Sequence, residues 1–418
     1  MKTYTITLDS AEITCKPNSI LSSRISAYLL ANGHIIDRDP RKADYIIINT
    51  CGFDQTRENL SHSLFKKYFS AKDKRTRIIS VGCLNRINRS AVKNNFGETI
   101  FIDDLNRLDE IFSRRIKFSD FKQAGLDPRV LKNLALNAAK GFDLTEKIYL
   151  GTAKLFYRFL RPAAGRNLRL EQVLAEAERS SKFYVEISQG CTNNCSYCII
   201  KKARGGLKSR PTEDILNDIG KLYCEDKTLC LVADDCGSYG RDIGTDIFCL
   251  LDEINSIHPG LKIDICYLYP FWLEKYETKY LELFRKLPIN SVNISLQSGS
   301  DRILSLMDRN YSAQKTLKII SNLRRVSPQT LIWTHILIGF PQETERDFQK
   351  TLAAIAAFDF SSKFVYSDRN GTKSAAMPGK ISAPVKAARK LRLQLKESSL
   401  FLGRFLSYLF SAGRSRRR

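Results

Sequence analysis

Short apolar runs alternate with longer amphipathic stretches along most of the chain. In the first part the strand-like runs are residues 44–49, 77–81 and 99–102, and the helical stretches between them are 55–70 and 105–113. Short strands that alternate with helices are typical of a doubly wound α/β domain with a parallel sheet. The pattern therefore predicts a small α/β domain over residues 1–115.

The same alternation returns on a larger scale over residues 181–380. The predicted strands are 183–188, 229–233, 262–267, 292–296, 331–338 and 363–366, separated by helical stretches that include 212–223, 246–257, 273–287 and 343–358. Six βα units indicate a partial (β/α)6 barrel rather than a closed barrel of eight units. Ligands in such folds bind at the carboxyl ends of the strands.

Two further segments complete the predicted organisation. Residues 116–180 read as helical, with an aromatic–basic stretch at 154–161 that is a linker, a substrate-contacting insertion or, as packing is the commonest use of aromatics, a packed helix. Residues 381–418 read as a helical tail that ends in three arginines. The tail's basic and apolar side chains fit phosphates, an anionic membrane surface or a protein partner.

Composition places the chain among ordinary globular proteins. Its 418 residues are 43% hydrophobic and 27% charged, enough for two domains. The start of the chain is strand-like and lacks an apolar signal core, and no run reaches the roughly 18–20 apolar residues of a membrane-spanning helix. The eleven cysteines therefore indicate a cytoplasmic protein with free thiols rather than a disulfide framework.

The chain is strongly basic. Its formal net charge is +23, which favours a polyanionic partner such as nucleic acid. The simpler alternative is a solvated basic surface, and charge alone does not separate the two.

Three cysteines share one short loop directly after the predicted strand 183–188. These loop cysteines are Cys191, Cys195 and Cys198, spaced C-x3-C-x2-C with Tyr197 before the last. Three thiolates bind three corners of a cubane iron–sulfur cluster and leave the fourth iron open, unlike the ferredoxin pattern, which supplies a ligand to every iron. An open metal position is where a substrate or cofactor binds. The loop resembles that of the radical S-adenosylmethionine (SAM) enzymes.

A second set of cysteines follows the strands of the first domain. These strand-end cysteines are Cys15, after the apolar start of the chain, Cys51, after residue 49, and Cys83, after residue 81. The carboxyl ends of neighbouring parallel strands converge, so the three thiols can meet and hold another cluster with an open iron. A single cysteine of this kind is more often a buried hydrophobe.

The motifs around both sets resemble one family, the radical SAM methylthiotransferases. They are Cys15-Lys-Pro-Asn18, Asn49-Thr-Cys51, Gly82-Cys83, Ile187-Ser-Gln-Gly-Cys191, Tyr197-Cys198 through Arg204, Ser238 to Gly244, Gln297-Ser-Gly-Ser300, Met307 to Tyr311, Gly339-Phe-Pro-Gln-Glu-Thr344 and Tyr366 to Thr372. The resemblance covers both α/β regions in the family's order. Tyr239 and residues 201–204 are most similar to the archaeal and eukaryotic branch, which acts on threonylcarbamoyl-adenosine in tRNA.

The resemblance implies two [4Fe–4S] clusters with different tasks. The cluster on the loop cysteines would chelate SAM and cleave it by one electron to a 5′-deoxyadenosyl radical, which abstracts a hydrogen atom. The auxiliary cluster on the strand-end cysteines would present a sulfur to the substrate radical, and a second SAM would supply the methyl group. The protein supplies position and the exclusion of water.

Several other residues are predicted to bind the cofactors. Two of the predicted loops after strands carry small residues that let the backbone approach SAM, although ordinary βα turns also carry Gly and Pro. The predicted cofactor-binding residues are Tyr197, Asp235, Gln297, Ser298, Gly299, Gly339 and Pro341.

The sequence also departs from the family pattern. About forty residues follow Gly371 and Thr372, too few for the β-barrel domain with which many members end. His335 stands where an acidic residue is more frequent, and Thr14 stands where glycine is usual before Cys15.

The sequence thus predicts a radical SAM methylthiotransferase that inserts a methylthio group at C2 of a hypermodified adenosine in tRNA. The first alternative is thiolation or methylthiolation of a peptide, protein or small intermediate, which Tyr267-Leu-Tyr-Pro270 favours because it resembles the branch that modifies a ribosomal protein. The second is a binding protein on a radical SAM scaffold. The expected partners are tRNA, an electron donor such as a flavodoxin or ferredoxin, and a sulfur source.

Overall fold

The computed structural model describes residues 2–11, 15–113, 115–121 and 182–415, and these form two compact units. The first unit contains described residues up to 121 together with 182–191 and 199–234, and the second contains 192–198 and 235–415. The predicted helical segment 116–180, with its aromatic–basic stretch, lies outside the described residues from 122 onward.

The first unit opens with a five-stranded parallel sheet, as the apolar pattern predicted. Its strands are β1 (Thr5–Ser10), β2 (Ile35–Ile36), β3 (Tyr45–Thr50), β4 (Arg77–Gly82) and β5 (Ile100–Phe101), in the order β2-β1-β3-β4-β5. The helices are α1 (Lys16–Ala31), α2 (Gln55–Ala71), α3 (Leu84–Ile87), α4 (Arg89–Asn95) and α5 (Asp109–Phe112), with short 3-10 turns at Pro40–Lys42, Leu105–Leu108 and Phe118–Asp120. The doubly wound α/β prediction for this domain is confirmed.

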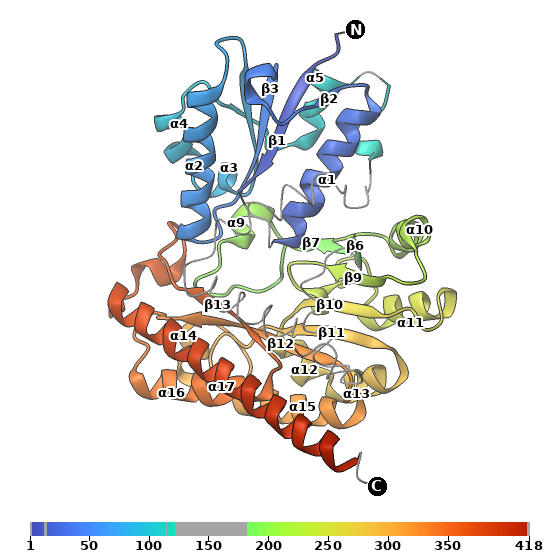
Figure 1. Ribbon diagram of the computed structural model, residues 1–418, viewed down its shortest axis with the longest axis vertical. Helices are drawn as coiled ribbons and strands as arrows, with labels where there is room; N and C mark the ends of the chain where they lie inside the picture. The colour runs from blue at the N-terminus through green and yellow to red at the C-terminus, as the bar shows by residue number, and fades with distance from the viewer. Residues whose placement is uncertain (1, 12–14, 114, 122–181, 416–418) are drawn as a thin grey trace. The chain divides into compact units, whose positions relative to one another are not determined.

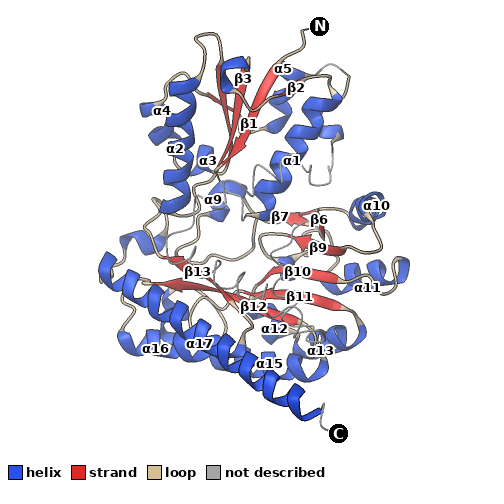
Figure 2. Cartoon of the chain, viewed as in Figure 1, coloured by secondary structure: helices blue, strands red, loops and turns tan. Residues whose placement is uncertain are grey.

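Helices cover both faces of this sheet (Figures 1 and 2). On one face Tyr28 of α1 and Phe112 of α5 pack against Ile47 and Ile79, and on the other Phe65 of α2 packs among residues of the same strands. Successive residues of β3 thus pack into the apolar cores on opposite faces of the sheet. This is why its apolar run is continuous, as is usual for a parallel strand buried on both faces.

The first unit also holds the first two strands of the second α/β region. β6 (Lys182–Glu186) pairs in parallel with β9 (Thr228–Val232), and the short strands β7 (Ser188–Gln189) and β8 (Lys208–Ser209) pair antiparallel. The helices between them are α9 (Ile200–Arg204) and α10 (Thr212–Leu222).

The second unit contains four parallel strands and seven helices among its described residues. The strands β10 (Ile263–Leu268), β11 (Ile289–Ile294), β12 (Leu331–Ile338) and β13 (Ser361–Val365) pair in chain order. The helices are α11 (Ile247–Ile257), α12 (Pro270–Lys275), α13 (Glu277–Lys286), α14 (Asp301–Leu306), α15 (Ala313–Val326), α16 (Glu345–Ala354) and α17 (Ala383–Ser415), with 3-10 turns at Cys236–Ser238, Ile355–Ala357 and Lys373–Ala376. All six strands predicted for 181–380 are present.

Two helix predictions are corrected by the structure. The stretch 273–287 is two helices, because Tyr276 has a non-helical backbone (φ −126°) between α12 and α13, and α12 begins at Pro270. The stretch 343–358 begins as a helix only at Glu345, because Thr344 caps it: its hydroxyl accepts from the Asp347 N–H while the Asp347 carboxylate accepts from the Thr344 N–H.

No helix within the described ranges is both long and apolar enough to cross a membrane.

Candidate functional site

The strand-end cysteines lie where neighbouring parallel strands end. Cys51 directly follows β3. Cys83 directly follows β4 and immediately precedes α3, and Cys15 immediately precedes α1 a few residues after β1. Because β1, β3 and β4 are adjacent, these positions share one edge of the sheet. All are free thiols. The prediction that Cys51 and Cys83 follow strands of one sheet is therefore confirmed.

One arginine brings two of these thiols together. Nη2 of Arg204 lies 3.8 Å from Sγ of Cys15 and 3.9 Å from Sγ of Cys83. Cys51 is buried, and its backbone is fixed to α2 because its N–H donates to the Ser61 hydroxyl at 3.0 Å. In the part of the chain that the structure describes, no three His, Cys, Asp or Glu side chains are arranged to hold a metal ion. The joint binding of a cluster by these thiols therefore stays a prediction.

Arg204 also connects these thiols to the segment that carries Cys191. Its Nη1 pairs with Oδ1 of Asp234 at 3.2 Å, and Oδ2 of Asp234 accepts from the Gly190 N–H at 2.8 Å. Burial opposes the charged form of Arg204, but Asp234, Cys83 and Cys15 together keep its pKa well above the usual range. A permanent cation thus lies beside the thiols of Cys15 and Cys83. Through Asp234 it is also connected to Gly190, the residue before Cys191.

Cys195 and Cys198 belong to the second unit, in a loop held by backbone and side-chain bonds. The Cys198 N–H donates to the Cys195 carbonyl at 3.0 Å, which turns the chain between them. Ser196 anchors the turn, because its N–H donates to the Met307 carbonyl at 2.9 Å and its hydroxyl to Leu306 at 2.8 Å. The loop between the two cysteines is therefore fixed to the end of α14.

A buried arginine faces Cys195. Arg309 is only 7% exposed, and its Nη1 lies 3.7 Å from Sγ of Cys195 and 2.8 Å from the Tyr197 hydroxyl. Its other donors reach the Tyr311 hydroxyl and the Ser295 carbonyl. Among the described residues no carboxylate forms an ion pair with it. A buried cation without an anion is costly, so this environment fits an anionic group at Cys195, as a thiolate-bound cluster would be.

Asp235 is a second buried charged residue that is hydrogen-bonded to the cysteine loop. It is buried, and its Oδ2 accepts from Asn193 Nδ2 at 3.1 Å and from Trp272 Nε1 at 2.7 Å. Burial raises its pKa to about 6, against the four donors that favour the charged form. The predicted cofactor residue Asp235 is thus bonded to residue 193 between the loop cysteines and to α12.

The predicted loop at residues 297–300 is packed against α16. The Gly299 N–H donates to the Thr351 hydroxyl at 3.0 Å, and a Cβ on Gly299 would lie 2.4 Å from the Lys350 carbonyl oxygen. Ser298 is fully buried and contacts the same hydroxyl. Gln297 has φ +64° and exchanges backbone bonds with β12. These contacts account for the small residues as packing, and their role toward SAM stays a proposal.

The predicted loop with Gly339 and Pro341 adjoins the cysteine loop. The ring of Phe340, between these two residues, lies 6.4 Å from that of Tyr197, edge to face. The Gly339 N–H donates to the Glu343 carboxylate at 2.9 Å, and Gly339 has φ +73°, which favours glycine.

Sequence reasoning gave no role to three polar side chains that hold the site. Arg309 and Asn193 lie inside the family-like motifs. Their partners, Cys195 and Asp235, are distant in sequence, and only the fold brings them into contact. Trp272 contacts Asp235 across 37 residues, and nothing in its local pattern distinguishes it from an ordinary core aromatic.

Comparisons with known proteins agree with this arrangement. A model of the radical SAM superfamily matches residues 185–355, and a model described as uncharacterized protein family UPF0004 matches residues 9–103. The ribosomal protein uS12 methylthiotransferase RimO of Thermoanaerobacter sp. (strain X514) is 31% identical over 389 residues, 91% of this chain and 80% of the relative. A tRNA-2-methylthio-N(6)-dimethylallyladenosine synthase of Thermodesulfovibrio yellowstonii is 28% identical, with the same coverage.

Solved structures support the fold. The radical SAM methyltransferase TsrM from Kitasatospora setae, with cobalamin and a [4Fe–4S] cluster bound, superposes with a TM-score of 0.58 at 12% identity, over 90% of this chain and 77% of that one.

The fold and the two matched models define a radical SAM enzyme. The chain belongs to the radical SAM methylthiotransferase family, whose cofactors are SAM and [4Fe–4S] clusters.

Proposed function

We propose that the loop cysteines and the strand-end cysteines each hold one [4Fe–4S] cluster, and that the enzyme replaces a hydrogen on an unactivated carbon by a methylthio group. The clusters and SAM supply the radical chemistry and the sulfur when bound. The observation that carries the assignment is the pair of arginines, one against the thiols of Cys15 and Cys83 and the other against Cys195. Charge-assisted bonds to sulfur favour the deprotonated thiols that bind iron.

The chain's own groups would orient the cofactors. We propose that SAM lies near Tyr197, whose hydroxyl is fixed by Arg309, and near the loop with Gly339 and Pro341, which adjoins Tyr197 through Phe340. Asp235 would act by holding Asn193, because its oxygens are already occupied. Gln297, with its left-handed backbone, would present its amide at the end of β11, while Ser298 and Gly299 support it.

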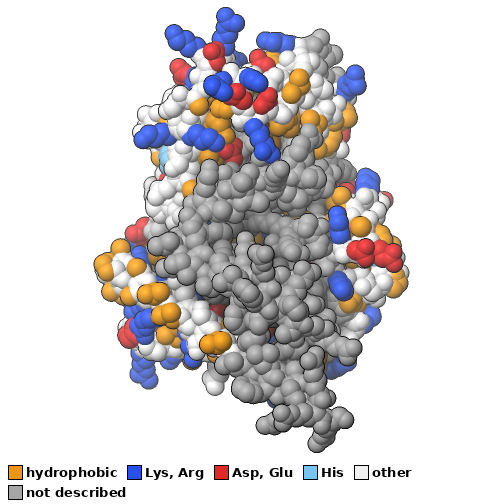
Figure 3. All heavy atoms as spheres, viewed as in Figure 1, with side chains coloured by type: hydrophobic (Ala, Val, Ile, Leu, Met, Phe, Trp, Pro, Cys, Tyr) orange, Lys and Arg blue, Asp and Glu red, His pale blue; other side chains and the backbone are white. Residues whose placement is uncertain are grey.

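For the substrate we propose a hypermodified adenosine of the threonylcarbamoyl type in tRNA, modified at C2. The net charge of +23 supports a polyanionic substrate, and Lys and Arg side chains lie at several separate points of the face drawn in Figure 3. A relative named for another adenosine product in tRNA, 2-methylthio-N(6)-dimethylallyladenosine, covers 91% of this chain, which supports tRNA as the substrate class and says nothing of the threonylcarbamoyl group.

The second candidate substrate is a ribosomal protein. Two observations favour it: a relative at 31% identity is named for uS12, and Tyr267, in the segment that resembles that branch, has φ +58° near the carboxyl end of β10. A strained non-glycine residue at such a place often marks a functional position. The Tyr267 ring packs 5.4 Å from that of His335.

Mass spectrometry of both substrates from the same cells decides between them. Cells with the gene, without it and with Cys195→Ala would be compared for nucleosides of total tRNA and for intact uS12. A methylthio-sized gain on a modified adenosine, present only with the intact gene, supports the tRNA proposal. The same gain on uS12 instead supports the second candidate. A gain that persists with Cys195→Ala would contradict the assignment of the loop cysteines.

A further inference from the structure

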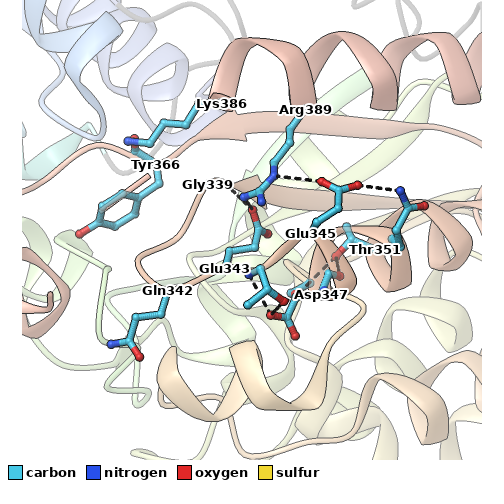
Figure 4. Close-up of polar contacts among 12 residues, drawn as sticks. Gly339, Gln342, Glu343, Glu345, Asp347, Thr351, Tyr366, Lys386 and Arg389 are labelled. Atoms are coloured by element: carbon cyan, nitrogen blue, oxygen red, sulfur yellow. Dashed lines mark hydrogen bonds and ion pairs between the residues drawn. The ribbon is translucent and has the colours of Figure 1, made fainter. Parts of the chain in front are cut away.

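Two basic residues of α17, one turn apart, reach the ends of two strands of the second unit. Lys386 donates to the carbonyl of Tyr366, directly after β13, at 2.9 Å, and its ammonium lies 5.3 Å from the centre of that ring. Arg389 donates from Nη1 to Oε2 of Glu343, after β12, at 2.8 Å. Figure 4 shows both side chains pointing from the helix toward these loops.

The Arg389–Glu343 pair is buried. The side chains of Arg389 and Glu343 are 6% and 1% exposed. Glu343 Oε2 also accepts from the Gly339 N–H, so one carboxylate oxygen connects the helix to the first residue of the loop after β12. The Lys386 side chain packs directly against Gly339, because a Cβ built on Gly339 would lie 2.5 Å from Cγ of Lys386.

The loop from Gly339 to Glu343 has an unfavourable backbone conformation. Gly339 has φ +73° and Gln342 has φ +66°, and the second is unfavourable for a residue with a side chain. Phe340, between them, is fully buried and contacts both Tyr197 and Tyr366. The position of Phe340 against the cysteine loop therefore depends on what holds residues 339 and 343.

We infer that Arg389 is a positioning residue for SAM binding, because with Glu343 it fixes the loop after β12 against Tyr197. The inference rests on the proposal that Gly339 and Pro341 contact SAM. It adds that α17 sets SAM affinity through this ion pair. The helix itself is held independently, because Leu393 packs against Ile336, Ile338 and Phe348.

A double variant separates positioning from stability. Removing one member of a buried ion pair strands the other charge, whereas replacing both by groups of similar size is often neutral. We expect Glu343→Gln with Arg389→Met to unfold at the wild-type denaturant concentration. The reconstituted full chain should nevertheless bind SAM about tenfold more weakly in anaerobic equilibrium dialysis. Amide hydrogen exchange of residues 339–344 should be about tenfold faster.

The matched control is Arg392→Gln on the same helix. Arg392 pairs with Glu345 at 2.7 Å, and both side chains are about half exposed. Glu345 also lies 4.0 Å from Nε of Arg389, but Arg392→Gln leaves the buried pair of Arg389 and Glu343 in place, so it should change neither SAM affinity nor exchange. Arg389→Lys keeps the charge and should recover part of both. The inference is overturned if the double variant, or Arg389→Gln should the double variant not fold, keeps either wild-type SAM affinity or wild-type exchange in residues 339–344.

The test remains separate from the proposed function. A wild-type chain that binds SAM without making a methylthio product would contradict the proposed substrate, while the comparison of SAM affinities still stands. A wild-type chain that does not bind SAM would contradict the proposed cofactor residues, and the exchange of residues 339–344 would then decide the role of Arg389 alone.

Discussion

At the scale of single residues, two arginines place positive charge beside the sulfur atoms. They differ in how that charge is balanced. Arg204 has Asp234 at 3.2 Å, while among the described residues the hydrogen-bond partners of Arg309 are hydroxyls, a carbonyl and the thiol of Cys195. The charge on Arg309 should therefore act more fully on a group bound at Cys195.

Arg309→Gln should lower the reduction potential of the cluster on the loop cysteines. Charges about 6 Å apart at an effective dielectric constant of about 20 interact by about 3 kcal/mol, which is on the order of 100 mV for one electron. The measurement is a redox titration followed by electron paramagnetic resonance, with Cys15, Cys51 and Cys83 replaced by Ala so that one cluster remains. The exposed Arg325→Gln should leave the potential unchanged, and equal potentials in both variants would contradict the role of Arg309.

Arg204→Gln should reduce the iron bound at the strand-end cysteines. The variant removes the donor shared by Cys15 and Cys83 and leaves the Asp234 carboxylate with the Gly190 N–H but without its ion-pair partner. After anaerobic reconstitution we expect iron to fall from about eight toward about four per chain, while SAM cleavage persists. Arg107→Gln, at an exposed arginine of the same unit, is the control. Full iron content in Arg204→Gln would show that the guanidinium does not support these thiols.

At the scale of elements, glycines show where backbone segments meet. A Cβ on Gly299 would collide with the backbone of α16, whereas a Cβ on Gly220, exposed in α10, would meet nothing within 4 Å.

Gly299→Ala and Gly220→Ala should change stability in opposite directions. The first should lower the free energy of unfolding by about 1–3 kcal/mol, because the loop must move away from α16. The second should raise it by up to about 1 kcal/mol through helix propensity. Urea unfolding of the SAM-free chain measures both. If Gly299→Ala were neutral there but weakened SAM binding, Gly299 would serve the ligand rather than the packing.

The buried pair of Glu343, in the loop after β12, and Arg389 of α17 makes stability depend on pH. Burial raises the pKa of Glu343 from 4.5 to about 7, against the Gly339 N–H and Arg389. Between these values the folded chain binds more protons than the unfolded chain, so the free energy of unfolding falls as pH rises. The contribution is fully present below pH 4.5 and is lost through pH 7, at most on the order of 3 kcal/mol.

Urea unfolding at pH 5 and pH 8 tests this dependence. Glu343→Gln should remove most of the difference between the two pH values. Glu345→Gln, at an exposed carboxylate two residues further along that lies 4.0 Å from Nε of Arg389, should keep it. An unchanged difference in Glu343→Gln would assign the dependence to another group.

The elements themselves could be predicted from sequence far better than their long-range contacts. Periodicity located β3, β4 and β12 within a residue or so, because strands buried on both faces are continuous apolar runs. It missed the break at Tyr276 and the cap at Thr344, which depend on single side chains. The cysteines could be recognised by spacing. The contact of Arg309 with Cys195 could not, because it joins residues 114 apart through the fold.

At the scale of the whole molecule, the two compact units each contain part of the proposed chemistry. The first holds the strand-end cysteines and Cys191, and the second holds Cys195 and Cys198. The cysteine motif is therefore continuous in sequence, while its residues belong to both units. The net charge belongs to this scale too, because +23 summed over 418 residues acts on a partner before any single contact forms.

Binding of tRNA should accordingly depend steeply on salt. Each phosphate neutralised by Lys or Arg releases condensed counterions, so the logarithm of affinity falls with the logarithm of salt by somewhat less than one per contact. With about six phosphate contacts, affinity should fall about a thousandfold between 50 and 200 mM salt. The slope should be the same for tRNA with and without the adenosine modification, because phosphates rather than the base set it.

Filter binding at several salt concentrations measures the slope, with uS12 titrated in parallel. If tRNA binding were absent or independent of salt while uS12 bound tightly, the net charge would reflect only a solvated basic surface, and the ribosomal protein would be the better substrate.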